Sequence, residues 1–198
     1  LLARAAARVG PSAYWKPVQT GTESDTEEVV RLAGASVRAL APAHHFVLPA
    51  SPHEAAAAER ARVDVEALDA AFDQHRGSLP GAVLVAELAG GLLVPWTLET
   101  TQLDWLARRR PPVVLVARSG LGTLNHTLLS LEALRARHLE PLALFLVGPP
   151  HGSNRETLRA LGRVGALYEM PPLEPLDTAA LDAWIDVNDL TPLWVGGC

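Results

Sequence analysis

Cysteine is nearly absent from this chain of 198 residues, because its one cysteine is the last residue, Cys198. A single cysteine excludes a disulfide framework and a cysteine-ligated metal site within the chain, and this usage is typical of a reducing cytosol. No apolar run reaches the roughly 20 residues that a membrane-spanning helix needs. Residues 1–10 contain arginines and lack the order of regions of a signal peptide. We therefore expect a cytoplasmic protein with no membrane association.

Excess positive charge is lacking as well. The net charge is −5 at pH 7, and the basic residues are scattered apart from one dense run at 108–110, which is typical of a helix end. A nucleic acid is therefore not an expected partner. Hydrophobic residues make up 48% of the chain and the mean hydropathy is +0.14, enough for a sizeable core. We expect residues 1–198 to form a single domain.

Lysine is the rarest charged residue, since Lys16 stands alone beside sixteen arginines. It lies where an apolar run ends in a turn, in the segment 14–21 (Tyr-Trp-Lys-Pro-Val-Gln-Thr-Gly). A compact ammonium on a flexible stem suits a phosphate or carboxylate anchor, whereas a guanidinium prefers bidentate pairing. The sequence therefore indicates a specific role for Lys16. A surface lysine left in an arginine-biased chain is the alternative.

Four apolar runs predict buried strands, at 82–86, 113–117, 142–147 and, more weakly, 13–18. They do not alternate with polar residues, which is typical of parallel strands covered on both faces. Helical patterns separate them: an alanine-rich helix end closed by Gly10, a capping box at 51–54, leucines spaced from 124 to 134, and a last helix near 179–185. We expect an α/β fold, a doubly wound and mostly parallel sheet with helices on both faces.

Ligands of such sheets bind beyond the carboxyl ends of the strands. The residues at these ends include Lys16 and Thr20, then Glu87 before two glycines, then the glycine-punctuated turn 118–126, whose free N–H groups would bind an anion. Asp25 could bind a metal, or it could cap a helix with Glu28, and the sequence leaves these alternatives even.

Other side chains are weaker candidates. Glu87 could be a solvated strand end, although a carboxylate before Ala-Gly-Gly favours a magnesium ligand. We interpret His44, His45 and His53 as residues of a proline-rich loop, with His53 lining the site, and His126 as a structural residue at a helix start.

A glycine-rich phosphate loop ending in Gly-Lys-Ser/Thr does not occur in this sequence. The chain opens inside a helix directly before the Lys16 strand, where the helix after such a loop would end, and it does not start with Met. We therefore expect a strand, loop and helix start of about 20 residues upstream of Leu1.

Together these segments resemble dethiobiotin synthetases of the P-loop ATPase superfamily. The resemblance rests on residues 16–21 with Ser24 and Asp25, on 51–53 (Ser-Pro-His), on 87–95 (Glu-Leu-Ala-Gly-Gly-Leu-Leu-Val-Pro) and on 120–127 (Gly-Leu-Gly-Thr-Leu-Asn-His-Thr). It extends from residue 1 to about residue 175. The lysine-proline and glutamate-glycine motifs alone would also fit cobyrinic acid amide synthetases.

The resemblance implies a homodimeric, ATP-dependent and Mg²⁺-dependent ligase that converts 7,8-diaminononanoate and CO₂ into dethiobiotin through a carbamate and its phosphoric anhydride. It implies that Lys16 is catalytic, that Thr20 contacts the diamine, and that Asp25 and Glu87 bind Mg²⁺. The implied receptor for the substrate carboxylate, across the dimer interface, is Gly122, Thr123, Leu124 and Asn125. The implied nucleotide-binding residues are Asp25, Glu87, Leu88, Ala89, Gly90, Val147, Gly148, Pro171, Pro172 and Leu173.

Three departures from the family pattern matter. Val147 stands where an asparagine that reads the adenine is usual, which predicts loose nucleotide selectivity. Leu88 replaces a small glycine and narrows the site. The phosphate loop does not occur in residues 1–198, and a protein that lacked it would be a non-catalytic, dimeric binding or regulatory paralogue.

Overall fold

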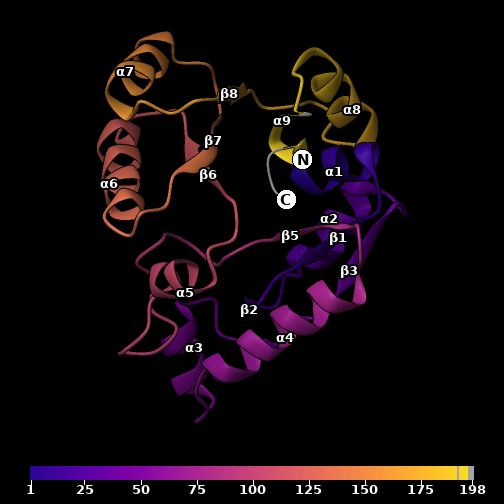
Figure 1. Ribbon diagram of the computed structural model, residues 1–198, viewed down its shortest axis with the longest axis vertical. Helices are drawn as coiled ribbons and strands as arrows, with labels where there is room; N and C mark the ends of the chain where they lie inside the picture. The colour runs from indigo at the N-terminus through magenta and orange to yellow at the C-terminus, as the bar shows by residue number, and fades with distance from the viewer. Residues whose placement is uncertain (191, 196–198) are drawn as a thin grey trace. The chain divides into compact units, whose positions relative to one another are not determined.

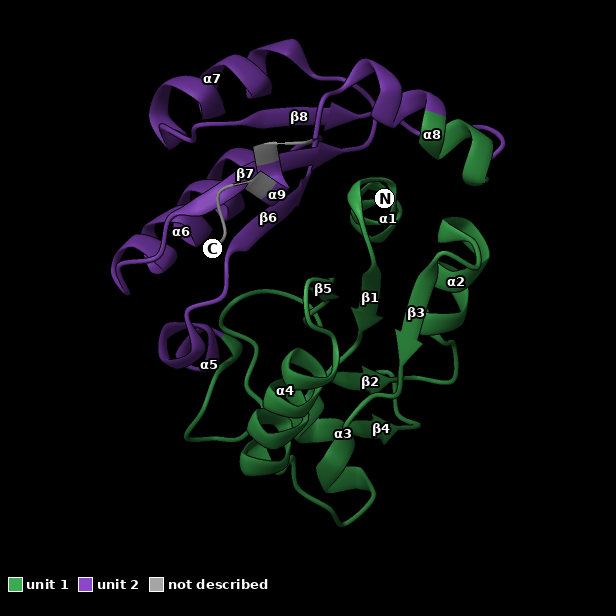
Figure 2. Ribbon diagram, turned by 45° about the vertical axis from the view of Figure 1, so that its right-hand side comes forward, with its two compact units in different colours: residues 1–102, 177–182 green, residues 103–176, 183–198 purple. Residues whose placement is uncertain are grey.

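The computed structural model describes residues 1–190 and 192–195, and Cys198 lies outside this range. The described chain divides into two compact units, residues 1–102 with 177–182 and residues 103–176 with 183–198 (Figure 2). The single domain expected over residues 1–198 stays a prediction. No described helix is long and apolar enough to cross a membrane.

Unit 1 contains short parallel strands and the helices that cover them (Figure 1). Its elements are α1 (Leu2–Val9), β1 (Ser12–Trp15), β2 (Val18–Thr20), α2 (Asp25–Ala33), β3 (Val37–Leu40), β4 (His44–Phe46), α3 (Pro52–Ala58), α4 (Val65–Ser78) and β5 (Val83–Ala86). One sheet has the order β3-β1-β5, and β2 pairs with β4 in a second sheet. All of these pairings are parallel.

Strand β1 is the centre of unit 1, and all four of its residues are buried. Successive side chains of a strand point to opposite faces. Tyr14 packs with Ala3 of α1 and Ala33 of α2 on one face. On the other face the Trp15 ring stacks on Phe72 of α4, with ring centroids 6.3 Å apart. Helices thus cover both faces of this sheet, as the predicted fold class requires.

Unit 2 repeats the pattern with longer strands. Its elements are α5 (Gln102–Arg109) after its first residue, β6 (Val113–Arg118), α6 (Thr123–Arg135), β7 (Pro141–Val147), α7 (Gly152–Gly162), β8 (Leu167–Met170), the second half of α8 (Thr178–Val187) and α9 (Pro192–Val195). The sheet has the order β6-β7-β8, and its pairings are parallel.

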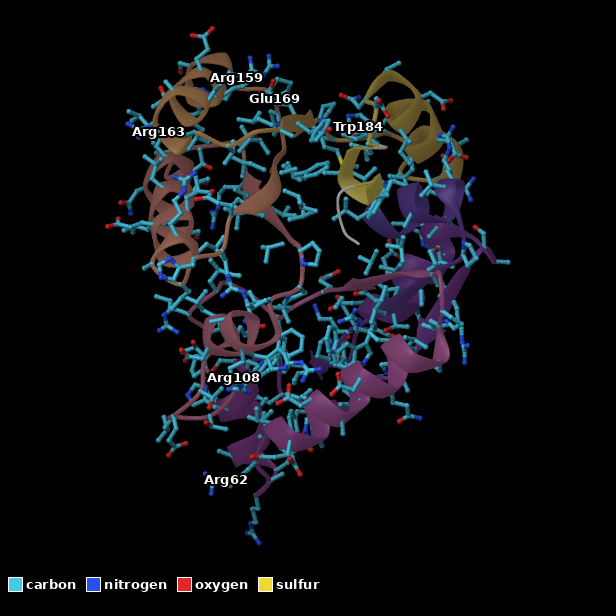
Figure 3. The ribbon with its side chains drawn as sticks, viewed as in Figure 1. Arg62, Arg108, Arg159, Arg163, Glu169 and Trp184 are labelled. Atoms are coloured by element: carbon cyan, nitrogen blue, oxygen red, sulfur yellow. The ribbon has the colours of Figure 1, made fainter. Side chains whose placement is uncertain are left out.

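The β7 strand carries the core of unit 2. Leu144 and Leu146 are buried against Leu158 of α7, with leucines of α6 packed on the same cluster. On the opposite face the Phe145 ring lies 6.2 Å from that of Trp184, which Figure 3 labels on α8. The predicted α/β class with parallel sheets is therefore confirmed.

Several predicted elements need correction. The predicted strand 13–18 is two strands, because Pro17 has no N–H to donate and interrupts the ladder after β1. The prediction that the apolar runs are buried holds for β1 and for the middle of β7, whereas the residues of β5 and most residues of β6 are partly or fully exposed. Ser51 directly precedes α3, but its hydroxyl bonds to no backbone N–H among the described residues. The hydroxyl faces His53 and Glu54 instead, so the capping box is not formed.

Candidate active site

Lys16 lies directly after β1 and is buried, with its side chain only 7% exposed. Its Nζ is 2.8 Å from Asp25 Oδ2 and 3.0 Å from Glu87 Oε1. The carboxylate side chains are 44% and 50% exposed, so the ammonium lies beneath two acidic groups that reach solvent. The structure therefore brings together Lys16 and Glu87, which the sequence placed at strand ends, and Asp25, for which the sequence left metal binding and helix capping open.

The parallel sheet explains why Glu87 meets Lys16. Strands β1 and β5 pair in register as far as Trp15 opposite Ala86, and the Glu87 N–H then donates to the Trp15 carbonyl oxygen at 2.9 Å. Residues that follow two neighbouring parallel strands leave the sheet at the same edge. Glu87 is therefore fixed at its backbone beside the start of the Lys16 side chain.

Asp25 reaches Lys16 from the first residue of α2. The helix is capped by Ser24, whose Oγ accepts the Glu27 N–H at 3.2 Å, and Glu28 pairs with Arg31 at 2.6 Å. The capping alternative for Asp25 is therefore wrong: the serine before it does the capping. This leaves the Asp25 carboxylate for Lys16.

Charge balance holds Lys16 in its protonated form. Burial lowers the pKa of Lys16, but hydrogen bonds and ionic attraction to Asp25 and Glu87 outweigh that effect and raise the pKa above its ordinary value. The side chain is therefore an ammonium at any physiological pH.

Tyr14 is a member of the cluster that the sequence did not single out. Its hydroxyl donates to Glu87 Oε2 at 2.9 Å, while Lys16 donates to Oε1 of the same carboxylate. Burial and the nearby charges of Glu87 and Asp25 raise the pKa of Tyr14, so the phenol stays protonated and remains a donor. The sequence could have indicated Tyr14 through its position two residues before Lys16, because residues two apart in a strand lie on the same face.

Thr20 is the last residue of β2, opposite Phe46. The next residue, Gly21, has a φ of +89° and donates to the Phe46 carbonyl oxygen at 2.9 Å. The chain thus turns sharply after Thr20 before it reaches Asp25. Leu88, Ala89 and Gly90 follow Glu87 in the loop after β5, and Gly90 also has a positive φ, of +79°.

In unit 2 the predicted carboxylate receptor lies at the start of α6. Gly122 precedes the helix with a φ of +89°, and Thr123, Leu124 and Asn125 form its first turn. The Thr123 hydroxyl is buried and shares a hydrogen bond with Thr127 at 3.1 Å. The Thr123 N–H donates to the Gly120 carbonyl oxygen at 3.2 Å. The N–H groups of Leu124 and Asn125 have no partner within the helix and suit an anion.

The remaining predicted nucleotide residues also meet in unit 2. Strands β7 and β8 pair in register as far as Val147 opposite Met170, and the Gly148 N–H donates to the Met170 carbonyl oxygen at 3.0 Å. Pro171, Pro172 and Leu173 follow β8 directly. Their positions at one strand edge agree with a shared site, while their binding of a nucleotide stays a prediction.

The histidines are placed differently from the prediction. His44 and His45 belong to strand β4, and His53 is in helix α3 rather than in a loop. The Asp64 N–H donates to His44 Nε2 at 3.1 Å, and His45 Nε2 lies 3.1 Å from the Gly21 carbonyl oxygen. His126, in the first turns of α6, has its ring beside Gly122.

The carboxylate oxygens around Lys16 suit a hard cation that takes its remaining ligands from water or from a substrate. Within residues 1–190 and 192–195 no group of three His, Cys, Asp or Glu side chains could hold a metal ion. Asp25 and Glu87 offer carboxylate oxygens, each with more than one lone pair, on half-exposed side chains. Mg²⁺ commonly uses one or two carboxylates and takes its other ligands from water and phosphate. The two carboxylates fit that requirement.

The sequence of the chain is similar to those of known proteins over most of its length. The family model described as an AAA domain matches residues 1–180. A protein from Rhodopseudomonas palustris named ATP-dependent dethiobiotin synthetase BioD is 45% identical over 175 residues, which cover 86% of this chain and 78% of that protein. A protein of the same name from Brucella anthropi is 45% identical over 173 residues, covering 85% and 77%.

A protein from Bordetella avium named biotin biosynthesis bifunctional protein BioCD is 41% identical over 177 residues. The match covers 86% of this chain and 36% of that protein. Alignments of this length include residues of both units, so the similarity is not confined to the surroundings of Lys16.

Proposed function

The chain belongs to the ATP-dependent dethiobiotin synthetase family, and we propose that the cluster of Lys16, Asp25 and Glu87 is its catalytic centre. The enzyme is an ATP-dependent ligase of biotin biosynthesis, which closes the ureido ring of dethiobiotin. The names of the relatives favour this activity over the amide synthetase alternative.

The reaction has three bond-forming steps. An amine nitrogen of 7,8-diaminononanoate attacks CO₂ and loses a proton, giving a carbamate. A carbamate oxygen attacks the γ-phosphorus of ATP and the bond to ADP breaks, giving a carbamic-phosphoric anhydride. The second amine then attacks the carbonyl carbon, closes the ring and expels phosphate.

The difficult step is the attack of the anionic carbamate on the anionic γ-phosphate of ATP. Phosphoryl transfer needs positioning and charge neutralisation more than covalent help from the protein. Of the three N–H donors of the Lys16 ammonium, two hold Asp25 and Glu87. The third can donate to the carbamate or to the transferring phosphoryl group. A donor fixed in advance stabilises developing charge without reorganisation.

Asp25 and Glu87 are the residues that would hold Mg²⁺, which supplies Lewis-acid charge for the phosphate oxygens when it is bound. Glu87 is already held by Tyr14 and Lys16, so its carboxylate has a fixed direction. Asp25 approaches from the N-terminal turn of α2.

The other site residues are proposed by their family positions. Thr20 contacts the diamine. The protein is a cytoplasmic homodimer, and the start of α6 binds the carboxylate of the substrate molecule held by the partner subunit. The residues at this start are Gly122, Thr123, Leu124 and Asn125. The residues Leu88, Ala89, Gly90, Val147, Gly148, Pro171, Pro172 and Leu173 contact the nucleotide. Light scattering of the purified protein tests the dimer.

The single observation that carries the proposal is the buried ammonium held between two half-exposed carboxylates at the carboxyl edge of β1 and β5. The test is ADP release by the full-length gene product with diamine, bicarbonate, Mg²⁺ and ATP. We expect release that depends on the diamine. Absence of ADP release contradicts the proposal and favours a non-catalytic paralogue, and ADP release that is independent of the diamine contradicts the proposed substrate. The phosphate loop stays a prediction, which the gene sequence upstream of the Leu1 codon tests.

A further inference from the structure

The chain contains three glutamines, and two of them are buried next to the Lys16 site. Gln19 is 5% exposed and Gln102 is fully buried, whereas Gln74 lies exposed on α4. Burying a primary amide is costly unless its donors and acceptor are all paired. The partners of these two amides therefore indicate why they are buried.

Gln102 binds the backbone of the loop that follows Glu87. Its Oε1 accepts the Ala89 N–H at 3.0 Å, and its Nε2 donates to the carbonyl oxygens of Ala89 at 2.7 Å and Gly91 at 2.9 Å. The Gln102 backbone N–H also donates to the Val94 carbonyl oxygen at 3.1 Å. One side chain thus fixes a loop that contains two glycines and begins at Glu87.

Gln19 does the same for the loop that leads to Asp25. Its Nε2 donates to the carbonyl oxygens of Thr20 at 3.1 Å and Glu23 at 3.0 Å. Its Oε1 accepts the backbone N–H of Asp25 itself at 3.3 Å. The start of α2, and with it the Asp25 carboxylate, is therefore held against β2 by one side chain.

We propose that Gln19 and Gln102 are positioning residues for catalysis, each fixing the loop that carries one of the two carboxylates of Lys16. Neither loop belongs to a β ladder, and the loops contain Gly21, Gly90 and Gly91, so their conformations need a fixed partner. The inference rests on the proposed function, because it assigns these amides to the same site. A misplacement of about 1 Å at such a site can cost about 100-fold in rate.

The experiment compares Gln19→Met and Gln102→Met, which keep the length of the side chain and remove its hydrogen bonds. Gln74→Met makes the same substitution at the exposed position. Leu158→Ala removes core packing in unit 2 and lowers stability without touching the site. All variants are made in the full-length gene product, and thermal unfolding confirms that each is folded.

The first readout does not use activity. Acetylation of Lys16 by a soluble acylating reagent is followed by peptide mass spectrometry in the absence of substrates. The two carboxylates shield the ammonium, so we expect Gln19→Met and Gln102→Met to increase the acetylation rate of Lys16 several-fold. Gln74→Met and Leu158→Ala should leave that rate unchanged.

The second readout separates positioning from substrate binding. For Gln19→Met and Gln102→Met we expect kcat to fall by about tenfold or more, with a smaller change in the KM for the diamine. Should Gln102→Met not fold, Gln102→Asn, which retains a shorter amide, takes its place beside Gln19→Met.

An acetylation rate and a kcat equal to those of the wild type in both glutamine variants would overturn the inference. The same changes in Leu158→Ala as in the glutamine variants would also overturn it, because they would indicate a general loss of rigidity. A wild-type protein without diamine-dependent ADP release would overturn the proposed function instead. The acetylation rates would then still decide whether the amides hold the carboxylates on Lys16.

Discussion

Both units end parallel strands at candidate binding residues, but they present different groups there. Unit 1 presents charged side chains, with Lys16 between Asp25 and Glu87. Unit 2 presents backbone, because Gly122 and Gly148 have positive φ values of +89° and +128° and prolines follow β8. Side-chain charges can stabilise a developing anion, whereas glycine backbone without a Cβ allows a ligand to approach closely. The chemistry proposed for unit 1 therefore depends on side-chain charge, and the ligand contacts proposed for unit 2 depend on backbone.

The largest expected effect comes from removing the cation of unit 1. Lys16→Ala should lower diamine-dependent ADP release by at least about 100- to 1000-fold, because a preorganised donor to the developing charge is lost. Circular dichroism should show an unchanged fold. Arg62→Ala is the control, since that side chain is 83% exposed and extends from unit 1 into solvent (Figure 3). Turnover retained by Lys16→Ala would show that the role assigned to Lys16 is wrong.

The backbone contribution of unit 2 can be broken at Gly148. A Cβ there would lie 2.6 Å from Ser119 Oγ, and the φ of +128° is strained for any other residue. Gly148→Ala should therefore lower the free energy of unfolding by about 1–3 kcal/mol and raise the KM for the nucleotide. Urea denaturation and steady-state kinetics measure the two effects.

The matched substitution is Gly152→Ala, in α7, where a Cβ meets no atom within 4 Å. This variant should be as stable as the unsubstituted protein or slightly more so, because alanine favours helix. Equal losses in both glycine variants would contradict the role given to the Gly148 backbone.

The choice of nucleotide tests the role of unit 2, because the Val147 side chain has no hydrogen-bonding group with which to recognise a base. The nearby amide of Asn154 already donates to the Ser119 carbonyl oxygen at 2.9 Å. We expect kcat/KM with GTP and CTP to lie within about tenfold to 100-fold of the ATP value, and Val147→Asn to widen the preference for ATP. A discrimination above 10⁴-fold in the unsubstituted protein would mean that other groups read the base.

The smallest expected effect concerns an ion pair within unit 1. Arg4 donates to both oxygens of Asp182 at 2.8 and 2.7 Å, and Arg8 lies 3.9 Å from the same carboxylate. The hydrogen bond from Arg4 lowers the pKa of Asp182. This stabilisation is present above the unfolded pKa of about 4 and is lost as the pH falls through the lower folded value.

Asp182→Asn should therefore cost about 1 kcal/mol of unfolding free energy at pH 7, and less at pH 2–3. Urea denaturation at both pH values measures it. Glu140→Gln in unit 2 breaks a more exposed pair with Arg135 and should cost less. A cost for Asp182→Asn that grows as the pH falls would contradict the sign of this linkage.

The sequence predicted the parts that depend on local pattern. Strands 83–86, 113–118 and 141–147 follow from continuous apolar runs, and the meeting of Lys16 and Glu87 follows from the common edge of parallel strands. Asp25 joins them from the start of α2, where the sequence left metal binding and helix capping as even alternatives. The short strands β3 and β4 were missed because 37–40 and 44–46 contain arginine and histidines among few apolar residues.

The supporting contacts could not be predicted for a different reason. Gln19 and Gln102 bind backbone atoms, and the partners of Gln102 lie 11 and 13 residues away. A backbone carbonyl is the same in every residue, so it leaves no mark in the sequence. Tyr14 and Glu87 are 73 positions apart, and only the register of β1 with β5 brings them together.

The protonation of Tyr14 has a consequence for the order in which ligands reach the site. With a neutral phenol, the four groups Tyr14, Lys16, Asp25 and Glu87 carry one positive and two negative charges, a sum of −1. A bare triphosphate would therefore meet net repulsion at the two carboxylates. For the proposed Mg²⁺ site we therefore expect metal and nucleotide to arrive as one complex rather than in turn, because the cation has then already reduced the charge of the phosphates.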